Sequence, residues 1–490
     1  MTSEQADQKV TKWWLPLALL VLVFLVLGTC QTLIIPFFQG PDEQVHYATV
    51  QNWAESREMA QPAASRPEPT QSDDIQTYRF SEEVRETAHR MQFDEIKWQG
   101  TNTQRFATKS RDGENEGEIR SNAWHRSIDV YPTNASGTWS LYYLLGSGIE
   151  LLSSTLPIFD RMFLVRFLSV VIGMLTVLLA YTTARKLSWS PGIATIFASL
   201  IAFQPMFIAT SAVINIDILL IFSFSLFFYG AVRWFADGAS LPSGGILLFA
   251  TFLGIFAKGP GIVLLGLLLI LFTVSFYQQF RTICRERLFT CFLGFFVVTI
   301  LVFIFIPPDI LANFLHLGTT SVFSTPLASL SAYIEKTLSA GPILWTAVSY
   351  WGSFGWLDNS FPRSFIHIIL TIETVAVFGL LWFCFDKNPP RFLPKKRILI
   401  LAVLSVTLLQ LAIRFFDWRV FDATGEILIG TPGRYFLPNI IPHLLLVVSG
   451  LGYLLPTPCA FRRLLLIFSA SLFSLVIYAT WFVIVPRYYL

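Results

Sequence analysis

The sequence predicts an all-α polytopic membrane protein, and three observations support this class. Hydrophobic residues make up 54% of the 490 positions, charged residues make up only 14%, and the mean hydropathy is +0.58. A soluble chain carries charge at about a quarter of its positions. Apolar runs of about 20 residues, the length that a helix needs to cross a bilayer, recur along most of the chain.

Eleven apolar segments are long enough to be predicted as spans: 14–36, 163–185, 191–210, 216–235, 245–257, 260–279, 288–307, 362–385, 397–414, 437–455 and 463–485. The first is too long for a signal peptide and lacks a small-residue cleavage site, so it is predicted to be retained. Two shorter apolar segments, 139–156 and 339–356, are predicted to lie on the outer surface or to re-enter the membrane. If both crossed instead, the bundle would have thirteen spans.

The distribution of basic residues orients these spans, because Lys and Arg near span ends mark the cytoplasm. With a cytoplasmic N-terminus and eleven spans, the basic groups at 185–186, 233, 281–287, 391–397 and 462–463 all fall inside. A single extra crossing at 139–156 would put most of these groups outside. The favoured topology has one cost, because it leaves Arg161 and Arg166 on the outer side.

Three regions follow from this topology. Residues 1–36 form a cytoplasmic N-terminus and the first helix, 37–138 a first outer loop, and 139–490 the bundle, with further outer loops at 308–361 and 415–436. The first loop holds 17 acidic and 11 basic residues, and its part 55–126 is predicted to be a mobile acidic insert between interfacial helices.

Several function classes are excluded by composition and spacing. A net charge of +3 with no basic tract or glycine-rich phosphate loop argues against nucleic acid as a partner. The five cysteines have no CxxC spacing, so neither a disulfide framework nor a zinc site is indicated. The predicted cytoplasmic loops are too short for a nucleotide-binding domain.

The most informative motif is GPDEQVHY at 40–47, directly after the first span. Charge at a membrane surface is costly unless it is solvated or used. Asp42 or Glu43 could act as a general base on a sugar or lipid hydroxyl, or could hold a divalent cation. The alternative is an acidic helix start after Pro41, with His46 on the same helix face as Asp42.

Two later motifs lie on the same predicted face. WGSFGWLD at 351–358 places Trp356 and Asp358 where an indole could stack under a sugar ring and a carboxylate could accept from its hydroxyls, although tryptophans also line membrane interfaces without binding sugars. GTPGRYFLP at 430–438 fixes a turn that presents Arg434, which suits bidentate binding of a phosphate. An ordinary lipid-facing arginine would look similar.

Isolated polar residues add weaker candidates. Lys258 lies between two spans on the predicted outer side, against the charge rule, and is either a phosphate ligand or a snorkelling lysine. Asn215-Ile216-Asp217 reads most simply as a helix cap. Glu373 is the one carboxylate well inside a clear span and is a functional candidate, but sequence supplies no partner, and His367 lies on another face of its helix.

With these residues in hand, the chain resembles a bacterial membrane family, domain-of-unknown-function family 2142. The elements PDE-x-x-H, GWLD and GRYFLP occur here in order at 41–46, 355–358 and 433–438, and the resemblance covers about 30–490. That family is similar to the GT-C superfamily of membrane glycosyltransferases. Two departures are visible: GTWSLYY stands at 137–143 in place of an HPPLYY-like segment, and Thr431-Pro432 replaces a polar residue before GRY.

The resemblance implies a GT-C-like bundle with outer-face interfacial helices in a bacterial inner membrane, using a polyprenyl-phosphate-linked sugar and a glycan or lipid acceptor. It makes Asp42 the base, with Glu43 as its partner or, with Asp42, as ligand of a divalent cation such as Mg or Mn. Arg434 and Lys258 become ligands of the donor phosphate. Sugar or acceptor contacts are expected from His46, Tyr47, Trp356, Asp358 and Tyr435.

Two other classes compete with a glycosyltransferase. A polysaccharide polymerase or ligase would be expected to use paired Arg and His residues in a large late loop, whereas the largest outer loop here is the first and is acidic. A lipid-linked glycan transporter would be expected to show internal repeats and polar or broken helices at the membrane midplane. No convincing repeat is found in the sequence.

Overall fold

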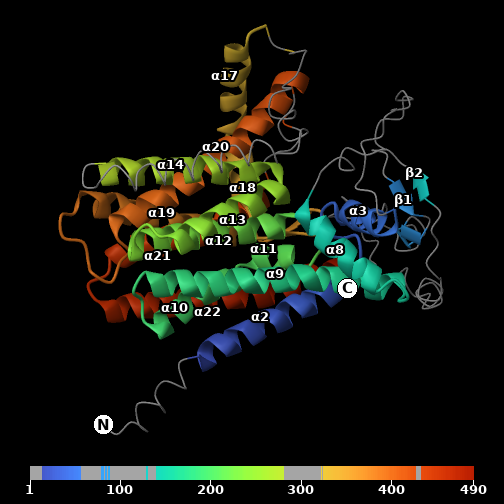
Figure 1. Cartoon of the computed structure of the whole chain (residues 1–490), viewed down its shortest axis with the longest axis horizontal. Coiled ribbons are helices and arrows are strands. Elements are labelled where there is room, and N and C mark those ends of the chain that lie inside the picture. The colour runs from blue at the N-terminus through green and yellow to red at the C-terminus, as the bar shows by residue number, and fades with distance from the viewer. Residues whose placement is uncertain are drawn as a thin grey trace.

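The computed structural model describes residues 14–56, 79–81, 83–84, 87–88, 128–130, 140–280, 322, 324–425, 427 and 432–489. Helices dominate these residues, and most of them run side by side in one bundle (Figure 1). The predicted all-α polytopic membrane class is therefore confirmed. The predicted span 288–307 and nearly all of the acidic insert lie outside the described residues.

Among the residues that the structure describes, seven helical stretches are long and apolar enough to cross a membrane. They are α2 (Leu15–Ile34), α9 (Ile158–Lys186), α12 (Asp217–Asp237), α19 (Arg363–Phe385), α20 (Lys396–Thr424), η2 with α21 (Gly433–Asn439 and Ile440–Tyr453), and α22 with η3 and α23 (Pro458–Tyr478, Ala479–Ile484 and Val485–Tyr489). Each coincides with a predicted span, but the total of eleven stays a prediction.

The predicted span 191–210 is broken. It consists of α10 (Pro191–Ala202) and α11 (Pro205–Ser211), which meet at an angle of 68°. Pro205 opens the second piece because it lacks an N–H and disfavours helical geometry in the residue before it. Gln204 is accordingly extended, and its side chain accepts a hydrogen bond from the N–H of Phe207. Counting this pair as one span gives eight.

The remaining elements complete the bundle and its outer surface. Two predicted spans are represented by α13 (Leu241–Ala257) and by η1 with α14 (Gly259–Gly261 and Ile262–Phe280). Outside the spans lie α3 (Glu43–Ser56), α8 (Leu141–Leu152), α17 (Pro326–Thr337) and α18 (Ala340–Trp351), with the strand pairs β1–β2 (Arg79–Ser81, Ile128–Val130) and β3–β4 (Ser353–Phe354, Asn359–Ser360), each antiparallel.

The segments 139–156 and 339–356 contain helices that are too short to cross. Each of α8 and α18 has 12 residues, or about 18 Å, against a hydrocarbon core of about 30 Å. In α8 the leucines Leu144, Leu151 and Leu152 are exposed, whereas Tyr143 and Glu150 are buried against the protein. This two-sided pattern is typical of an interfacial helix, as expected from the sequence.

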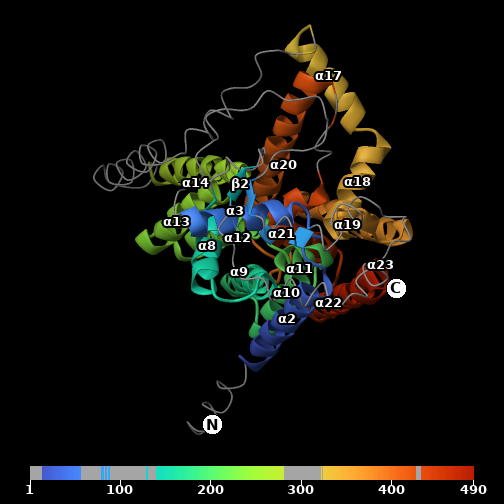
Figure 2. The ribbon, with the colours of Figure 1, turned by 90° about the vertical axis from the view of Figure 1, so that its right-hand side faces the viewer.

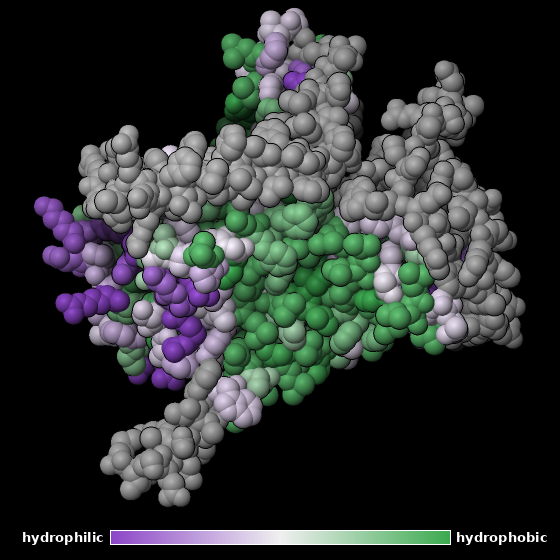
Figure 3. Space-filling model, viewed as in Figure 1, coloured by the Kyte–Doolittle hydropathy of each residue, from purple (hydrophilic) through white to green (hydrophobic). Residues whose placement is uncertain are grey.

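The two ends of the bundle differ in composition. The turns between α9 and α10, α12 and α13, α19 and α20, and α21 and α22 all lie at the left-hand end in Figure 1, and the visible surface there is polar. An apolar band covers the middle of the molecule (Figure 3). The opposite end carries α3 and α8, and Figure 2 views the bundle from that end. The basic groups at 185–186, 233, 391–397 and 462–463 belong to the turns at the left-hand end.

The parallel helices α19 and α21 approach each other most closely through small residues. A side chain added at Gly379 would place its Cβ 2.1 Å from the backbone oxygen of Gly450, and one added at Gly450 would lie 2.0 Å from the oxygen of Ala376. Glycine at both positions therefore allows backbone contact, which is a common way for membrane helices to pack.

Candidate functional site

The PDE motif forms the start of α3 and points its two carboxylates in different directions. Asp42 has a left-handed backbone, with φ of 59°, which Asp adopts more readily than most residues. Its carbonyl accepts hydrogen bonds from the N–H groups of Val45 and His46, which begins the helix. The Asp42 side chain is 51% exposed, whereas that of Glu43 is completely buried. The left-handed backbone at Asp42 therefore directs the two neighbouring carboxylates into different environments.

Glu43 is held by an extensive set of donors. Its Oε1 accepts from Arg166 Nε at 2.6 Å and from the N–H of Ile214 at 3.0 Å. Its Oε2 accepts from Arg166 Nη2 at 2.6 Å and from the N–H groups of Phe38 and Gly40 at 3.0 and 3.4 Å. The remaining Arg166 donors bind the carbonyl oxygens of residues 32, 35 and 36. Glu43 thus fastens the end of α2 to α9.

Asp42 instead lies beside a cation from the far end of the chain. Arg434, at the start of η2, places Nη2 3.4 Å from Asp42 Oδ2 and is itself buried, with 6% of its side chain exposed. Its Nε and Nη1 atoms are also buried and have no hydrogen-bond acceptor among the described residues. This guanidinium therefore retains donors for an anion.

A second cation lies close to the first. Lys258 Nζ is 2.6 Å from Asp217 Oδ1, and it lies 4.5 Å from the ring centre of Tyr435. The guanidinium of Arg434 lies 5.2 Å from the same ring centre, so Tyr435 lies near both cations. Asn215 caps α12 as expected, since its Oδ1 accepts from the N–H of Asp217. The role of Asp217 beside Lys258 was not predicted.

His46 and Tyr47, adjacent on α3, enter different surroundings. His46 Nδ1 is 2.7 Å from the hydroxyl of Tyr143, and burial lowers the pKa of His46 from 6.5 to about 4, against the opposing effect of Asp42. The imidazole is therefore neutral near pH 7. The hydroxyl of Tyr47 donates to Glu150, on the side of α3 that joins a buried ionic network.

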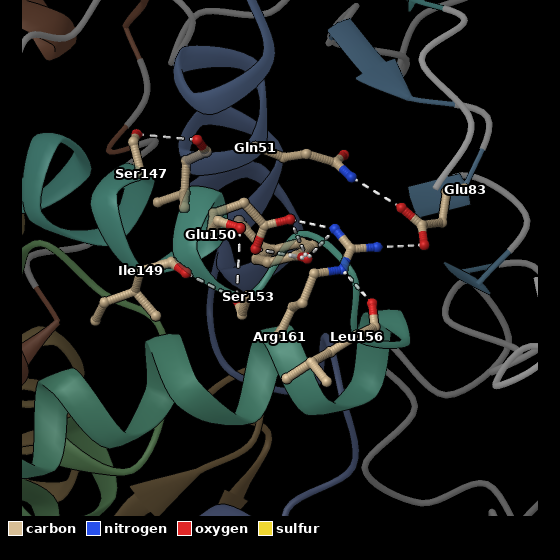
Figure 4. A network of polar contacts seen from close by, with 10 residues as sticks. Gln51, Glu83, Ser147, Ile149, Glu150, Ser153, Leu156 and Arg161 are labelled. Atoms are coloured by element: carbon tan, nitrogen blue, oxygen red, sulfur yellow. Dashed lines mark hydrogen bonds and ion pairs between the residues drawn. The ribbon is translucent and has the colours of Figure 1, made fainter. Parts of the chain in front are cut away.

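That network is centred on Arg161 (Figure 4). Arg161 forms ion pairs with both Glu83 and Glu150, and Glu83 also accepts from Gln51 Nε2 at 2.9 Å. The network joins the first outer loop to α3, α8 and α9. The predicted topology leaves Arg161 and Arg166 on the outer side, against the positive-inside rule. Both are compensated by acidic partners that sequence alone did not identify.

The GWLD segment packs beneath the PDE loop. Trp356 is 4% exposed, and its indole N–H donates to the carbonyl of Phe38 at 3.2 Å. Asp358 pairs with Arg487 at 3.1 Å. These contacts bring the second motif next to the first but direct both side chains toward protein partners, so their sugar contacts stay a prediction.

A small, open cleft lies beside Pro41 and Arg434. Its wall is mainly apolar with a few polar groups; the lining residues are Ile35, Gln39, Gly40, Pro41, Met206, Ala209, Thr210, Val213, Asn215, Phe354, Gly355 and Arg434. An apolar cleft with a buried cation at its wall suits a ligand that combines an anionic group with an apolar part.

The expected divalent cation finds no matching ligand set in the described part of the chain. No group of three or more His, Cys, Asp or Glu side chains is arranged for a metal among these residues. Asp42 has Arg434 as its neighbour, and both oxygens of Glu43 are occupied by N–H donors. A divalent cation at Asp42 would lie next to the guanidinium of Arg434, and one at Glu43 would have to displace that of Arg166. These two residues therefore do not fit a divalent cation.

Comparison with known proteins identifies a family. The model of the family described as predicted membrane protein (DUF2142) matches residues 20–443, which confirms the resemblance inferred from the motifs. No curated protein matches the sequence.

Two solved structures are similar at low identity. The apo crystal structure of ArnT from Cupriavidus metallidurans is 15% identical with a TM-score of 0.37, covering 91% of this chain and 78% of ArnT. The oligosaccharyltransferase AglB from Archaeoglobus fulgidus, in complex with an inhibitory peptide and a dolichol-phosphate, is 15% identical with a TM-score of 0.38, covering 94% of this chain. The match spans 55% of the length of AglB.

Proposed function

We propose that this chain, which belongs to the DUF2142 family of predicted membrane proteins, is a glycosyltransferase that uses a polyprenyl-phosphate-linked sugar. The acceptor is a hydroxyl of a cell-envelope glycan or lipid, and Asp42 is the general base. The reaction occurs at the outer face of a bacterial cytoplasmic membrane. The grouping of basic turns at the end opposite the site supports this orientation, with the N-terminus in the cytoplasm.

One observation carries the proposal: residues from three distant parts of the chain meet at one end of the bundle. Asp42 is half-exposed and lies 3.4 Å from the buried Arg434, and Lys258 shares the ring of Tyr435 with Arg434. A polyprenyl phosphate has an anionic group at the membrane surface and an apolar chain in the bilayer. Two fixed cations next to an apolar cleft match that combination.

The geometry supports a single displacement at the sugar. Asp42 accepts the proton of the acceptor hydroxyl, and the acceptor oxygen forms a bond to the anomeric carbon. The bond from that carbon to the phosphate oxygen breaks, and the polyprenyl phosphate leaves with the electron pair. A single displacement of this kind, with Asp42 as base and no covalent intermediate, inverts the configuration at the anomeric carbon. The proton then passes to water, which reaches the exposed side chain of Asp42.

The cations stabilise the charge that develops on the leaving group. Cleavage raises the negative charge of the phosphate by one, and donors fixed in advance lower the energy of such a transition state. Arg434 has two buried N–H groups without an acceptor among the described residues, so phosphate binding would satisfy them without breaking its contact with Asp42. Glu43 acts here through the backbone that it holds, and we assign it no proton transfer.

The proposal is tested by measuring sugar transfer in proteoliposomes that contain the purified protein. A panel of radiolabelled polyprenyl-phosphate sugars is supplied together with acceptors extracted from the native membrane. We expect the label to reach a glycan or lipid acceptor, and Asp42→Asn to reduce the rate by about 100- to 10,000-fold, the range for loss of a general base.

Two controls separate chemistry from folding and binding. Glu335→Gln changes an exposed carboxylate on α17 and should leave the transfer rate unchanged. Binding of polyprenyl phosphate should survive Asp42→Asn but weaken in Arg434→Ala. Transfer that persists in Asp42→Asn would refute the assignment of the base. Absence of transfer from every donor would favour a polymerase, ligase or transporter.

A further inference from the structure

Glu373 has a partner that sequence did not supply. Its Oε1 lies 3.1 Å from Nε2 of His443, and about three quarters of each side chain is buried. Glu373 follows the first residue of α19 by ten positions, which corresponds to a depth of about 15 Å in the helix direction. Ionisable groups at this depth are costly, so a pair that is retained there needs a compensating role.

Adhesion of the two helices does not supply that role. Below the pair, α19 and α21 already have backbone contact through Ala376, Gly379 and Gly450, and small residues are sufficient for close packing in a membrane. Replacing Glu373 and His443 with apolar residues would leave this contact intact. The pair must therefore be considered together with what it contacts on other elements.

The pair continues to a third residue, on α18. Nδ1 of His443 is 2.7 Å from the hydroxyl of Tyr350, and the two rings meet edge to face with centres 5.1 Å apart. An ionised Glu373 can only accept, so it fixes the imidazole proton on Nε2 and leaves Nδ1 to accept from the Tyr350 O–H. Glu373 thereby determines the tautomer of His443 and the orientation of Tyr350.

The backbone of α18 at Tyr350 supports the turn that bears Arg434. A Cβ at Gly433 would lie 2.2 Å from the nitrogen of Tyr350 and 2.1 Å from the carbonyl oxygen of Thr346, so the two backbones are in contact. The N–H of Gly433 donates to Ser349 Oγ at 2.6 Å. Gln204 Nε2 donates to the carbonyl of Tyr350 at 2.7 Å, which holds α18 from the other side.

We propose that Glu373 is a positioning residue that acts through His443 and Tyr350 to hold α18 against Gly433, and so keeps Arg434 beside Asp42. The expected effect of Glu373 on ligand binding rests on the proposed function, because Arg434 is assigned there to the donor phosphate. The positional consequence concerns the backbone at 432–440 and does not depend on any ligand.

The first experiment follows that backbone by hydrogen exchange of the full-length protein in nanodiscs. Glu373→Leu should increase exchange of the amides at 432–440, and Tyr350→Phe should do the same. Glu373→Gln keeps an oxygen that accepts from His443 Nε2 and should stay near wild type. His367→Leu changes an exposed residue of the same helix and is the matched control. Unchanged exchange in Glu373→Leu would overturn the proposal.

The second experiment measures binding of undecaprenyl phosphate to the same variants. Glu373→Leu should weaken binding by about tenfold, a typical coupling between linked sites, and the effect should vanish in an Arg434→Ala background. An equal effect in both backgrounds would indicate general destabilisation and would overturn the proposal. If Arg434→Ala binds normally while exchange at 432–440 still depends on Glu373, the donor assignment fails and the positioning role stands.

Discussion

Asp42 and Glu43 are adjacent carboxylates with opposite environments. Glu43 is completely buried and accepts five hydrogen bonds, two of them from one guanidinium. Asp42 is half-exposed, and its ion pair with Arg434 is a single contact at 3.4 Å. A fully satisfied carboxylate stabilises a fold but has no free lone pair for a reactant, whereas an exposed one can exchange protons. The comparison therefore assigns Glu43 a structural role and leaves Asp42 available for proton transfer.

The arginines that face these two acids repeat the contrast. Arg166 uses all three of its nitrogens, in five hydrogen bonds to Glu43 and to backbone carbonyls. Arg434 is also buried, but two of its nitrogens have no acceptor among the described residues. Buried donors of a cation are costly when they are unsatisfied, so Arg434 resembles a binding group and Arg166 a structural one.

The largest effect that would sharpen this comparison is on stability. Glu43→Gln should lower the free energy of unfolding by about 3–5 kcal/mol, because Arg166 is left as an uncompensated buried charge. Asp42→Asn should lower it by less, because this carboxylate is half-exposed and meets the buried Arg434 through a single contact at 3.4 Å. Thermal unfolding of both variants in detergent measures the difference. Equal stabilities would remove the distinction between the two carboxylates.

The next effect concerns pH and the neutral state of His46. The unfolded chain protonates this imidazole below about pH 6.5, whereas the folded protein does so only near pH 4. The unfolded state therefore binds more protons between these values, and stability is lost as pH falls through this window. Acidification from pH 7 to 4 should cost up to about 3 kcal/mol from this group.

The variant His46→Gln provides the reference for that measurement. Other titrating groups contribute to the pH dependence of both proteins, so the wild-type curve minus the variant curve isolates the contribution of His46. The difference should appear below pH 6.5 and grow toward pH 4. Parallel stability curves would mean that the histidine is not held neutral in the folded protein.

The smallest expected effect is on ligand binding, and it is tested by comparing two lysine–aspartate pairs at opposite ends of the bundle. Lys258 and Asp217 lie at the candidate site, whereas Lys186 and Asp237 form an exposed pair at 2.8 Å in the turns at the other end. Lys258→Met should weaken binding of polyprenyl phosphate about tenfold, or ~1.4 kcal/mol. Lys186→Met should leave binding unchanged. Similar losses in both variants would indicate a general electrostatic effect and not a phosphate contact.

Much of the fold could be predicted from sequence because the membrane restricts the choice. Apolar length predicted the long membrane helices, and the PDE, GWLD and GRYFLP motifs, which were predicted to share one face, lie close together. The break before Pro205 was missed, although a proline inside an apolar run is a sequence signal for it. The short helices α8 and α18 agree with the prediction that segments 139–156 and 339–356 are not ordinary spans.

The partners of buried charges could not be predicted. Arg161, Arg166 and Glu373 were visible as exceptions to the usual distribution, but their partners Glu150, Glu43 and His443 are fixed by helix packing. The direction in which a side chain points could not be predicted from the sequence either. Tyr47, for which the family resemblance implies a sugar or acceptor contact, directs its hydroxyl to Glu150 and Arg161, and its sugar contact stays a prediction.

The contacts of Glu43 also impose an order on synthesis of the chain. Arg166 and the amide of Ile214 are made 123 and 171 residues after Glu43, so the ribosome must complete α9 and reach residue 214 before those contacts can form. Asp42 meets Arg434 only after a further long stretch has been synthesised, since these two are 392 residues apart. The N-terminal motif therefore emerges early and is completed late, which delays assembly of the site until most of the helices are in place.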